Sequence, residues 1–244
     1  MPPVTLPLCH RQRRDEGLPA LSFGDGVIRY VAYRNKRRFV ALSGTFDAYL
    51  TKFSSKTRGN LKRQVKYFTA SAGELDFRYY AADSMPEFCQ LASMVSAASY
   101  QSKIGSGLPP SEEILANSDA IGFLLMHKNG PAAYALCMRQ GDVLIYSTIG
   151  YDPQYKDLSP GTVLLYLILQ RLFAEQRFRI FDFVVGGDYG YKTMFSTGSL
   201  EYARVLWFPW SLKNFALVGL HYLSRRLWDL MSAVKRKTSH AKRS

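Results

Sequence analysis

Residues 121–149, IGFLLMHKNGPAAYALCMRQGDVLIYSTI, hold three apolar runs separated by two short turns. The runs cover 121–126, 132–138 and 143–149, and each has the length of an ordinary strand. Gly130 and Gly141 lie in the two turns, and short glycine-containing loops typically join antiparallel neighbours. The stretch therefore predicts a three-stranded antiparallel meander.

Further elements extend this meander in both directions. Residues 75–80 alternate apolar and polar side chains, which predicts a strand, whereas the apolar run after Ser159-Pro160-Gly161 predicts a buried helix. The expected order is strand 75–80, a helix opening at Ser84, a short helix at 114–115, the meander, helix 162–176, strand 179–184, a helical turn 188–195 and strand 202–207. The sequence therefore predicts an α/β (α+β) fold with a mixed, mostly antiparallel sheet flanked by helices.

The N-terminal third predicts smaller elements before this core. Runs 27–33 and 39–42 favour strands, and we expect them to form a β-hairpin that turns at 34–37. A basic helix is predicted from 55 to 70, with Gly73 ending it. Residues 1–20 show no periodicity and are interpreted as a loose lead-in.

Composition excludes several classes of protein. The chain has 244 residues, 47% of them hydrophobic and 21% charged, which excludes a disordered or collagen-like protein. Its three cysteines, Cys9, Cys89 and Cys137, are odd in number and widely spaced, so neither a disulfide framework nor a zinc cluster is expected. No metal site is predicted, and the four histidines do not cluster. Because residues 1–14 resemble neither a signal peptide nor a membrane span, we expect the protein in the cytoplasm.

Positive charge is concentrated at the two ends of the chain. Residues 1–80 hold 15 basic and 6 acidic residues, residues 81–200 hold 8 and 11, and residues 201–244 hold 9 and 2. On the basic helix, Arg58, Lys62 and Arg63 either bind an anionic group of a substrate or form a solvated face. Few aromatic residues lie between these charges, so DNA and stacked single strands are not expected partners.

The C-terminal helix, predicted from 212 to about 234, has a continuous apolar stripe. Its members are Leu212, Ala216, Leu220, Leu223, Leu227, Leu230 and Val234. Basic residues lie on the helix and after it, so residues 208–244 are a candidate for contact with an anionic membrane surface. The alternative is that the stripe covers the protein's own sheet, which is the commoner use of such a helix.

Two local patterns have chemical meaning. A helix that opens with Ser159, Pro160 and Gly161 presents backbone N–H groups that suit a pyrophosphate, although any well-formed helix start looks the same. Asp182 interrupts an apolar strand, and a buried carboxylate needs a partner or a shifted pKa. Asp182 is interpreted in one of two ways. It acts as a general base or orients an acceptor amine or hydroxyl, or it is the structural partner of Lys192 or Arg179.

This order of elements resembles the GNAT acyltransferase fold. The motifs Tyr151-Asp152-Pro153, Ser159-Pro160-Gly161-Thr162 and Phe181-Asp182-Phe183, followed by Gly187-Asp188 and Tyr191-Lys192, are similar to the BioF2-like or CelD-like acetyltransferase domain. That family is related to the Fem-type aminoacyl transferases. The basic stretch 54–63 also resembles the family's entrance helix, so the resemblance covers about residues 45–207.

The resemblance implies a site and a reaction. Acetyl-CoA, as co-substrate, would be held by Tyr151, Ser159, Gly161 and Thr162, and the acceptor side would comprise Asp182, Asp188, Tyr191 and Lys192. Tyr191 would give a proton to the departing thiolate, and Lys192 would hold a phosphate or the developing oxyanion. The implied function is transfer of an acyl group from acyl-CoA to an amine or hydroxyl of a polysaccharide or cell-envelope precursor, or of a small metabolite.

Two other functions stay open. The stretch 156–162 keeps only one glycine of the usual donor loop, which together with the basic helix favours a Fem-like transferase that uses aminoacyl-tRNA. The other function is that of a catalytically silent module, which binds a partner or an anionic membrane. Such a protein would be peripheral at the inner face of the membrane.

The expected division of the chain is a lead-in (1–20), a hairpin and basic helical region interpreted as a vestigial first GNAT half (21–73), the acyltransferase domain (74–207), and the amphipathic helix with its basic tail (208–244).

Overall fold

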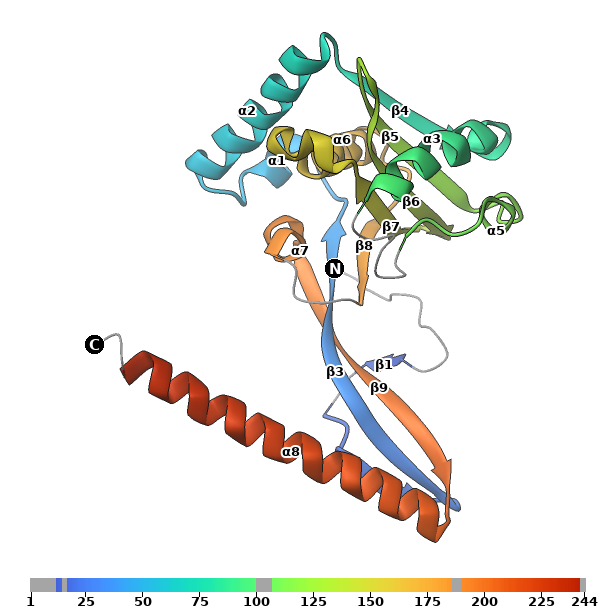
Figure 1. Ribbon diagram of the computed structural model, residues 1–244, viewed down its shortest axis with the longest axis vertical. Coiled ribbons are helices and arrows are strands. Elements are labelled where there is room, and N and C mark those ends of the chain that lie inside the picture. Colours follow the sequence, from blue (N-terminus) through green and yellow to red (C-terminus); the bar gives the residue numbers. More distant parts are fainter. Residues whose placement is uncertain (1–11, 15–16, 100–106, 186–189, 242–244) are drawn as a thin grey trace. The chain divides into compact units, whose positions relative to one another are not determined.

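The computed structural model describes residues 12–14, 17–99, 107–185 and 190–241, and the chain divides into two compact units. Unit 1 is Arg37–Leu200, and unit 2 combines the described parts of Leu8–Lys36 and Glu201–Ser244. The two units are described separately below (Figure 1).

Unit 1 is built on a mixed sheet. Its strands lie in the order β3, β8, β7, β6, β5, β4, and every neighbouring pair is antiparallel except β7 and β8, which are parallel. This arrangement confirms the predicted fold class, and β5, β6 and β7 are the predicted meander. The strands are β3 (Val27–Ala41, whose last residues belong to unit 1), β4 (Asp76–Ala81), β5 (Ala120–His127), β6 (Gly130–Gln140), β7 (Val143–Tyr151) and β8 (Ile180–Val185).

Helices cover both faces of this sheet (Figure 1). The helices α1 (Phe46–Leu50), α2 (Ser55–Ala72) and α6 (Pro160–Glu175) pack on one face, and α3 (Met85–Ala98) and α5 (Ser111–Leu115) pack on the other. The alternation along β5 shows why two layers are needed: Phe123 and Leu125 belong to the first core, whereas Leu124 belongs to the second. All three side chains are buried, so the sheet has no solvent-exposed face at this strand.

The basic helix α2 begins and ends where the sequence predicts. The Ser54 hydroxyl accepts a hydrogen bond from the Thr57 N–H at 3.2 Å, which satisfies one of the free amides of the first turn. At the other end Gly73 adopts φ 94°, a conformation that glycine accepts without strain.

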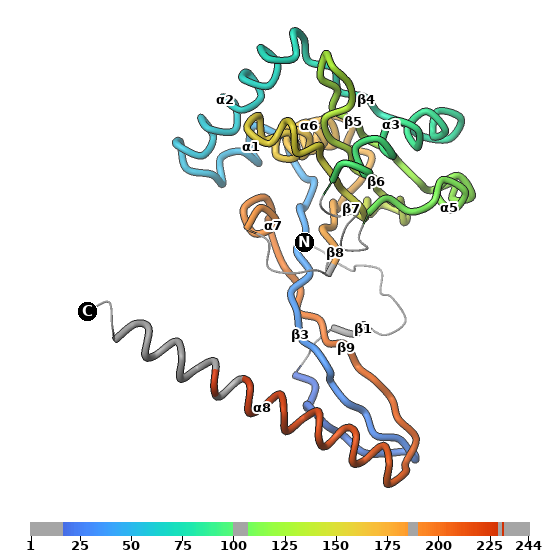
Figure 2. Tube along the Cα trace, viewed as in Figure 1, coloured from blue at the N-terminus to red at the C-terminus, as the bar shows by residue number. Residues whose placement is uncertain are grey.

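The hairpin predicted from the runs 27–33 and 39–42 is wrong, because both runs belong to one strand and the chain does not turn at 34–37. The strand β3 runs without interruption through these residues (Figure 2), and the hairpin instead joins β2 (Leu21–Gly24) to the start of β3. The turn is Asp25-Gly26, with φ values of 52° and 73°. Asp-Gly is a preferred pair for a two-residue hairpin turn because both positions need positive φ, whereas residues 34–37 contain neither glycine nor proline.

Unit 2 consists of this hairpin, β1 (Gln12–Arg14), most of β9 (Gly198–Pro209) and the long helix α8 (Leu212–Ala241). Val218 and Tyr222 of α8 pack on Ile28 and Tyr30 of the hairpin, and the Tyr30 hydroxyl lies 2.6 Å from His221 Nδ1. None of the helices within the described residues is long and apolar enough to span a bilayer.

Candidate functional site

The strands β7 and β8 pair over a short distance and then separate. Three parallel residue pairs join them, the last between Ile145 and Asp182, and the described residues form no further pair beyond it. On its other side β7 carries a β-bulge, because Tyr146 pairs with Cys137 and Thr148 pairs with Leu136, which leaves Ser147 as the extra residue. The second half of β7 therefore borders an opening in the sheet.

A cavity of about 330 Å³ lies beside this half of β7. Its walls come from β6 and β7, from the loop and first turns of α6, and from the short helix α7 (Gly190–Phe195). The lining residues that the sequence analysis had singled out are Tyr151, Ser159, Gly161, Thr162 and Tyr191. The structure thus brings the four predicted donor residues together with Tyr191 of the predicted acceptor side.

The N-terminus of α6 forms one wall of the cavity. Ser159 adopts φ 51° and ψ 47°, and its carbonyl accepts hydrogen bonds from the amides of Thr162 and Val163 at 3.0 and 3.1 Å. Because Pro160 has no N–H, the Gly161 amide is the first of this helix, and no hydrogen bond within the described residues uses it. A Cβ built on Gly161 would meet only Tyr151 Cδ1, at 3.9 Å, so the helix start is open on this side.

The charge around this helix start suits an anion. Lys156 lines the cavity, and among the described residues the lining includes no aspartate or glutamate. The aligned peptide dipoles add partial positive charge at the same place. From α2, Gln64 Nε2 lies 3.4 Å from the Ser159 hydroxyl oxygen.

Tyr146 of β7 also lines the cavity. Burial raises the pKa of Tyr146 well above its usual value, and the neighbouring Tyr191 raises it further. The Tyr146 hydroxyl therefore stays protonated at neutral pH. Tyr146 was not predicted as a site residue, because a tyrosine inside an apolar strand has the pattern of a core residue. Only the separation of β7 from β8 reveals its position.

Asp182 is fully buried on β8 and forms an ion pair with Arg37, which is itself buried. Its carboxylate also accepts a hydrogen bond from the Val184 N–H at 2.9 Å. Of the structural partners predicted for it, Arg179 is wrong, because Arg179 lies 3.3 Å from Asp142 instead. Arg37 was not among the predicted partners, since it is 145 positions away and meets Asp182 only because β3 and β8 are neighbouring strands.

The backbone directly after Asp182 is strained. Val184 has φ 61°, a region that β-branched residues avoid. Such strain persists only where surrounding contacts enforce it, and it is concentrated at functional sites.

The remaining acceptor residues lie around α7. Lys192 Nζ donates to the Phe183 carbonyl at 2.9 Å; burial lowers the pKa of Lys192, and the charge of Asp182 partly opposes this shift. Lys192 is not among the described residues that line the cavity. Asp188 lies outside the described residues.

Helix α7 is held in place by α1 and the residues that follow it. Lys52 Nζ donates to the carbonyls of Met194 and Ser196, and the Tyr49 hydroxyl donates to the Phe195 carbonyl at 2.7 Å. All three acceptors are carbonyls at or just after the C-terminal end of α7. A helix of six residues has only marginal stability alone, so these hydrogen bonds stabilise it. The position of Tyr191 is thereby tied to the core of unit 1.

The predicted anion-binding residues lie elsewhere on α2. Arg58 donates to the Phe53 carbonyl and to the Ser55 hydroxyl, and Arg63 donates to Asn60 Oδ1 at 2.5 Å. Neither they nor the exposed Lys62 are among the described residues that line the cavity. In the described ranges no group of three or more His, Cys, Asp or Glu side chains is placed to hold a metal ion.

Comparison with known proteins connects this geometry to a family. The family model described as an acetyltransferase (GNAT) domain matches residues 55–193, which is more than half of the chain. This range includes the meander, the cavity and most of α7. No significant match was found among curated protein sequences.

Solved structures share the fold at low sequence identity. The C-terminal DUF2156 domain assigned to a lysylphosphatidylglycerol synthetase of Agrobacterium fabrum aligns with a TM-score of 0.56 and 13% identity, over 81% of this chain and 66% of that one. L-PGS from Bacillus licheniformis aligns with a TM-score of 0.54 and 14% identity, over 81% and 67%. FemX aligns with a TM-score of 0.50 and 11% identity, over 80% and 66%. The chain spans about two thirds of the length of these structures, and the likeness concerns the fold.

Proposed function

The chain belongs to the acetyltransferase (GNAT) domain family and is a GNAT-type acyltransferase, and on that premise we propose that it transfers an acetyl group from acetyl-CoA to an amine or hydroxyl of a polysaccharide or cell-envelope precursor. The observation that supports the proposal is the cavity between the end of β7 and α7, with the N-terminus of α6 in its wall. We assign the chemistry to residues 74–207 and place the enzyme in the cytoplasm.

The donor side would use the start of α6. The Gly161 and Thr162 backbone and the Lys156 side chain offer positive charge to the phosphates of the donor, while Tyr151 and Ser159 border the same space. Because Gly161 has no side chain, a pyrophosphate can approach its amide directly. Acyl-CoA, when bound, supplies the reactive thioester.

The chain's own groups then act mainly by position. The acceptor attacks the thioester carbonyl directly, the carbon–sulfur bond breaks, and the Tyr191 hydroxyl gives its proton to the departing thiolate. The proton that the acceptor loses then returns Tyr191 to its neutral form, so the products are the acylated acceptor and the free thiol of CoA. The Tyr146 hydroxyl, which burial keeps protonated, adds a second dipole in the same cavity. No covalent enzyme intermediate is required.

The other residues have supporting roles in this proposal. Since the Asp182 carboxylate is bound to Arg37 and to the Val184 amide, we assign it the positioning of the end of β8 and not the removal of a proton. Lys192 joins β8 to α7 and, with Asp188, belongs to the acceptor side. Arg58, Lys62 and Arg63 are proposed to attract an anionic group of the acceptor.

Titration calorimetry tests the donor site. Wild type is expected to bind acetyl-CoA and desulfo-CoA with a dissociation constant in the micromolar range. Gly161→Glu is expected to weaken this binding by about 100-fold or more, because the new carboxylate blocks the approach to the Gly161 amide and repels phosphate. Gly59→Glu is the matched control: it adds the same charge on α2, where a Cβ meets nothing within 4 Å.

The same experiment separates the alternative donor. A Fem-like function would replace the CoA-dependent one if two results came together. The folded wild type would bind no CoA, and it would bind aminoacyl-tRNA in a salt-sensitive way that Arg58→Gln and Arg63→Gln weaken. The exposed basic groups of α2 are the observation that favours this second candidate.

A further inference from the structure

The helix α8 of unit 2 exposes a row of large apolar side chains that the transfer chemistry does not use. Val218 is 3% exposed, whereas Leu220 is 72% exposed and Leu227 is 61% exposed. Further exposed members are Leu212, Leu217, Leu223, Trp228 and Met231. Burying so many apolar groups is favourable at about 25 cal/mol per Å², and an exposed row of this kind marks an interaction surface.

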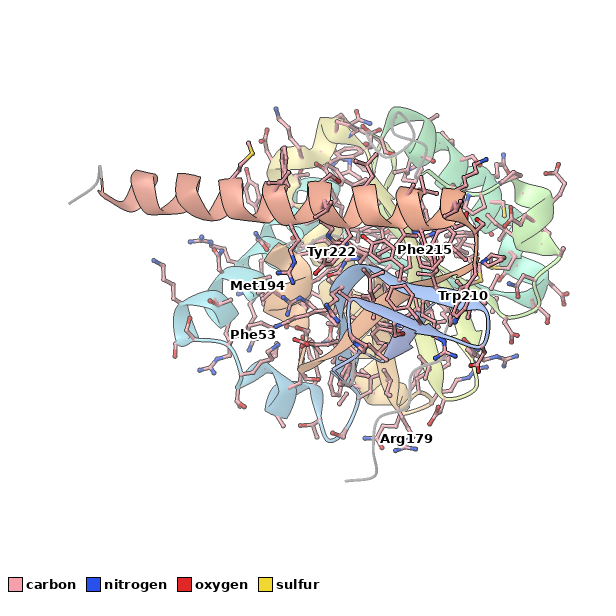
Figure 3. All side chains as sticks on the ribbon, turned by 90° about the horizontal axis from the view of Figure 1, so that it is seen from below. Phe53, Arg179, Met194, Trp210, Phe215 and Tyr222 are labelled. Carbon is pink, nitrogen blue, oxygen red and sulfur yellow. The ribbon has the colours of Figure 1, made fainter. Side chains whose placement is uncertain are left out.

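The helix has two apolar faces, and unit 2 uses one of them. Phe215 and Tyr222 extend from α8 toward the hairpin (Figure 3), where Phe215 stacks on Phe23 with ring centroids 5.9 Å apart. At 100° per residue, Leu220, Leu223 and Leu227 lie on the opposite side from Val218 and Tyr222. The expectation that the predicted stripe covers the protein's own sheet is therefore wrong for these leucines, because the other face of α8 does so.

A cationic cavity lies between the hairpin and the side of α8 that faces it. Its volume is about 290 Å³, and three arginines line it: Arg34 from β3, and Arg225 and Arg226 from α8. Arg34 donates to the Leu18 carbonyl, and Arg226 Nε donates to the Tyr222 hydroxyl oxygen at 3.1 Å. The Arg225 guanidinium lies over the Tyr33 ring of the hairpin, 5.8 Å from its centroid, so these arginines gather on the hairpin side of α8.

The charge of unit 2 identifies the kind of partner. Its two segments contain 15 of the 32 basic residues of the chain and 5 of the 19 acidic ones. Two tryptophans are exposed: Trp210 lies just before α8, and Trp228 lies within it. Tryptophan and arginine side chains both suit the boundary between lipid headgroups and acyl chains. An exposed apolar row on a strongly basic unit complements an anionic phospholipid surface.

We propose that unit 2 docks on an anionic phospholipid membrane. The exposed row of α8 lies at the boundary between headgroups and acyl chains, parallel to the membrane surface, and the basic side chains of unit 2 attract the anionic headgroups. This inference concerns a different surface from the proposed donor site, so each stands without the other.

Flotation of the full chain with vesicles tests this docking. Vesicles of phosphatidylglycerol and phosphatidylcholine (30:70) are expected to bind the protein at least tenfold more strongly than vesicles of phosphatidylcholine alone, with a strong decrease as salt is raised. Leu220→Glu with Leu227→Glu should lower binding at least tenfold, and Arg225→Gln with Arg226→Gln severalfold.

Two double variants in unit 1 control for these changes. Met94→Glu with Leu115→Glu alters two exposed apolar residues, and Lys62→Gln with Arg63→Gln removes two charges from α2; both should bind vesicles like wild type. Circular dichroism and acetyl-CoA titration of every variant separate loss of docking from loss of fold or of the donor site. The docking proposal is overturned if wild type does not float with anionic vesicles, if the control variants lose binding equally, or if the row instead closes a dimer that Leu220→Glu dissociates.

Discussion

The two units of the chain differ in how far they bury their apolar side chains. Unit 1 buries the side chains of β5 and β6 under helices on both faces, and its charge is nearly balanced, with 17 basic and 14 acidic residues. Unit 2 has small core clusters, exposes the apolar row of α8 and has three times as many basic as acidic residues. Unit 1 therefore forms a self-sufficient core, whereas unit 2 leaves apolar and basic side chains exposed, as the proposed membrane docking requires.

Breaking the buried ion pair of unit 1 should have the largest effect. Asp182→Asn leaves the Arg37 guanidinium buried without its counter-charge, and we expect the free energy of unfolding to fall by about 3–5 kcal/mol. In unit 2, Asp25→Asn breaks the exposed pair with Arg29 and should cost about 0.5 kcal/mol or less. Urea denaturation measures both, and equal losses would contradict the contrast between the units.

Removing the hydroxyl of Tyr191 should affect the reaction without affecting the fold. Tyr191→Phe is expected to lower kcat about 100-fold while KM for acetyl-CoA stays close to the wild-type value, because general acid catalysis by one group contributes on this order. Tyr222→Phe in unit 2 is the matched control and should retain the wild-type rate. Steady-state release of CoA thiol measures the effect, and an unchanged kcat for Tyr191→Phe would remove Tyr191 from its assigned role.

A glycine in each unit tests how tightly its surroundings are packed. A Cβ on Gly122 of β5 would lie 2.4 Å from the Phe88 ring, so Gly122→Ala should destabilise unit 1 by about 1–3 kcal/mol. A Cβ on Gly219 of α8 meets nothing within 4 Å, so Gly219→Ala should stabilise the helix by about 0.5–1 kcal/mol. Thermal unfolding should show opposite signs, and a loss of stability in both variants would contradict the account of α8.

The smallest expected effect concerns alkaline pH. Burial raises the pKa of Tyr146, so above pH about 10 the unfolded chain loses this proton while the folded chain keeps it, and the free energy of unfolding falls as pH rises. Tyr146→Phe should make this fall shallower between pH 9 and 11. Tyr67→Phe, which alters an exposed residue of α2, should leave the wild-type slope, and identical slopes for all three proteins would contradict the burial of Tyr146.

Local patterns predicted most of unit 1. Glycine turns and apolar runs were enough for the meander, and Gly73 marked the end of α2, because these signals act between neighbours in the sequence. Asp25-Gly26 is a strong signal for the hairpin turn of unit 2, whereas the turn predicted at the charged run 34–37 is wrong. Charge alone does not turn a chain, and β3 continues through it.

The site was only partly predictable, for a reason that its residues make clear. Tyr151, Ser159, Gly161 and Thr162 lie close together in the sequence around one helix start, so a motif could identify them. Tyr146 and the ion pair between Arg37 and Asp182 depend on which strands become neighbours and where they separate. Such long-range placement leaves no local signal in a single sequence.

The direction in which α8 faces was equally hidden. The leucines of α8 and its sheet-facing residues both recur every three or four positions. The sequence therefore shows two apolar faces and does not tell which of them is covered. The contacts of Val218 and Tyr222 with the hairpin decide it.

Titration of acetyl-CoA into wild type, Gly161→Glu and the Leu220→Glu, Leu227→Glu variant tests most directly the claim that unit 1 alone carries the donor site. We predict micromolar binding for wild type, at least a 100-fold loss for Gly161→Glu, and an unchanged dissociation constant for the α8 variant. Unchanged binding by Gly161→Glu, or loss of binding by a folded α8 variant, would contradict this division between the two units.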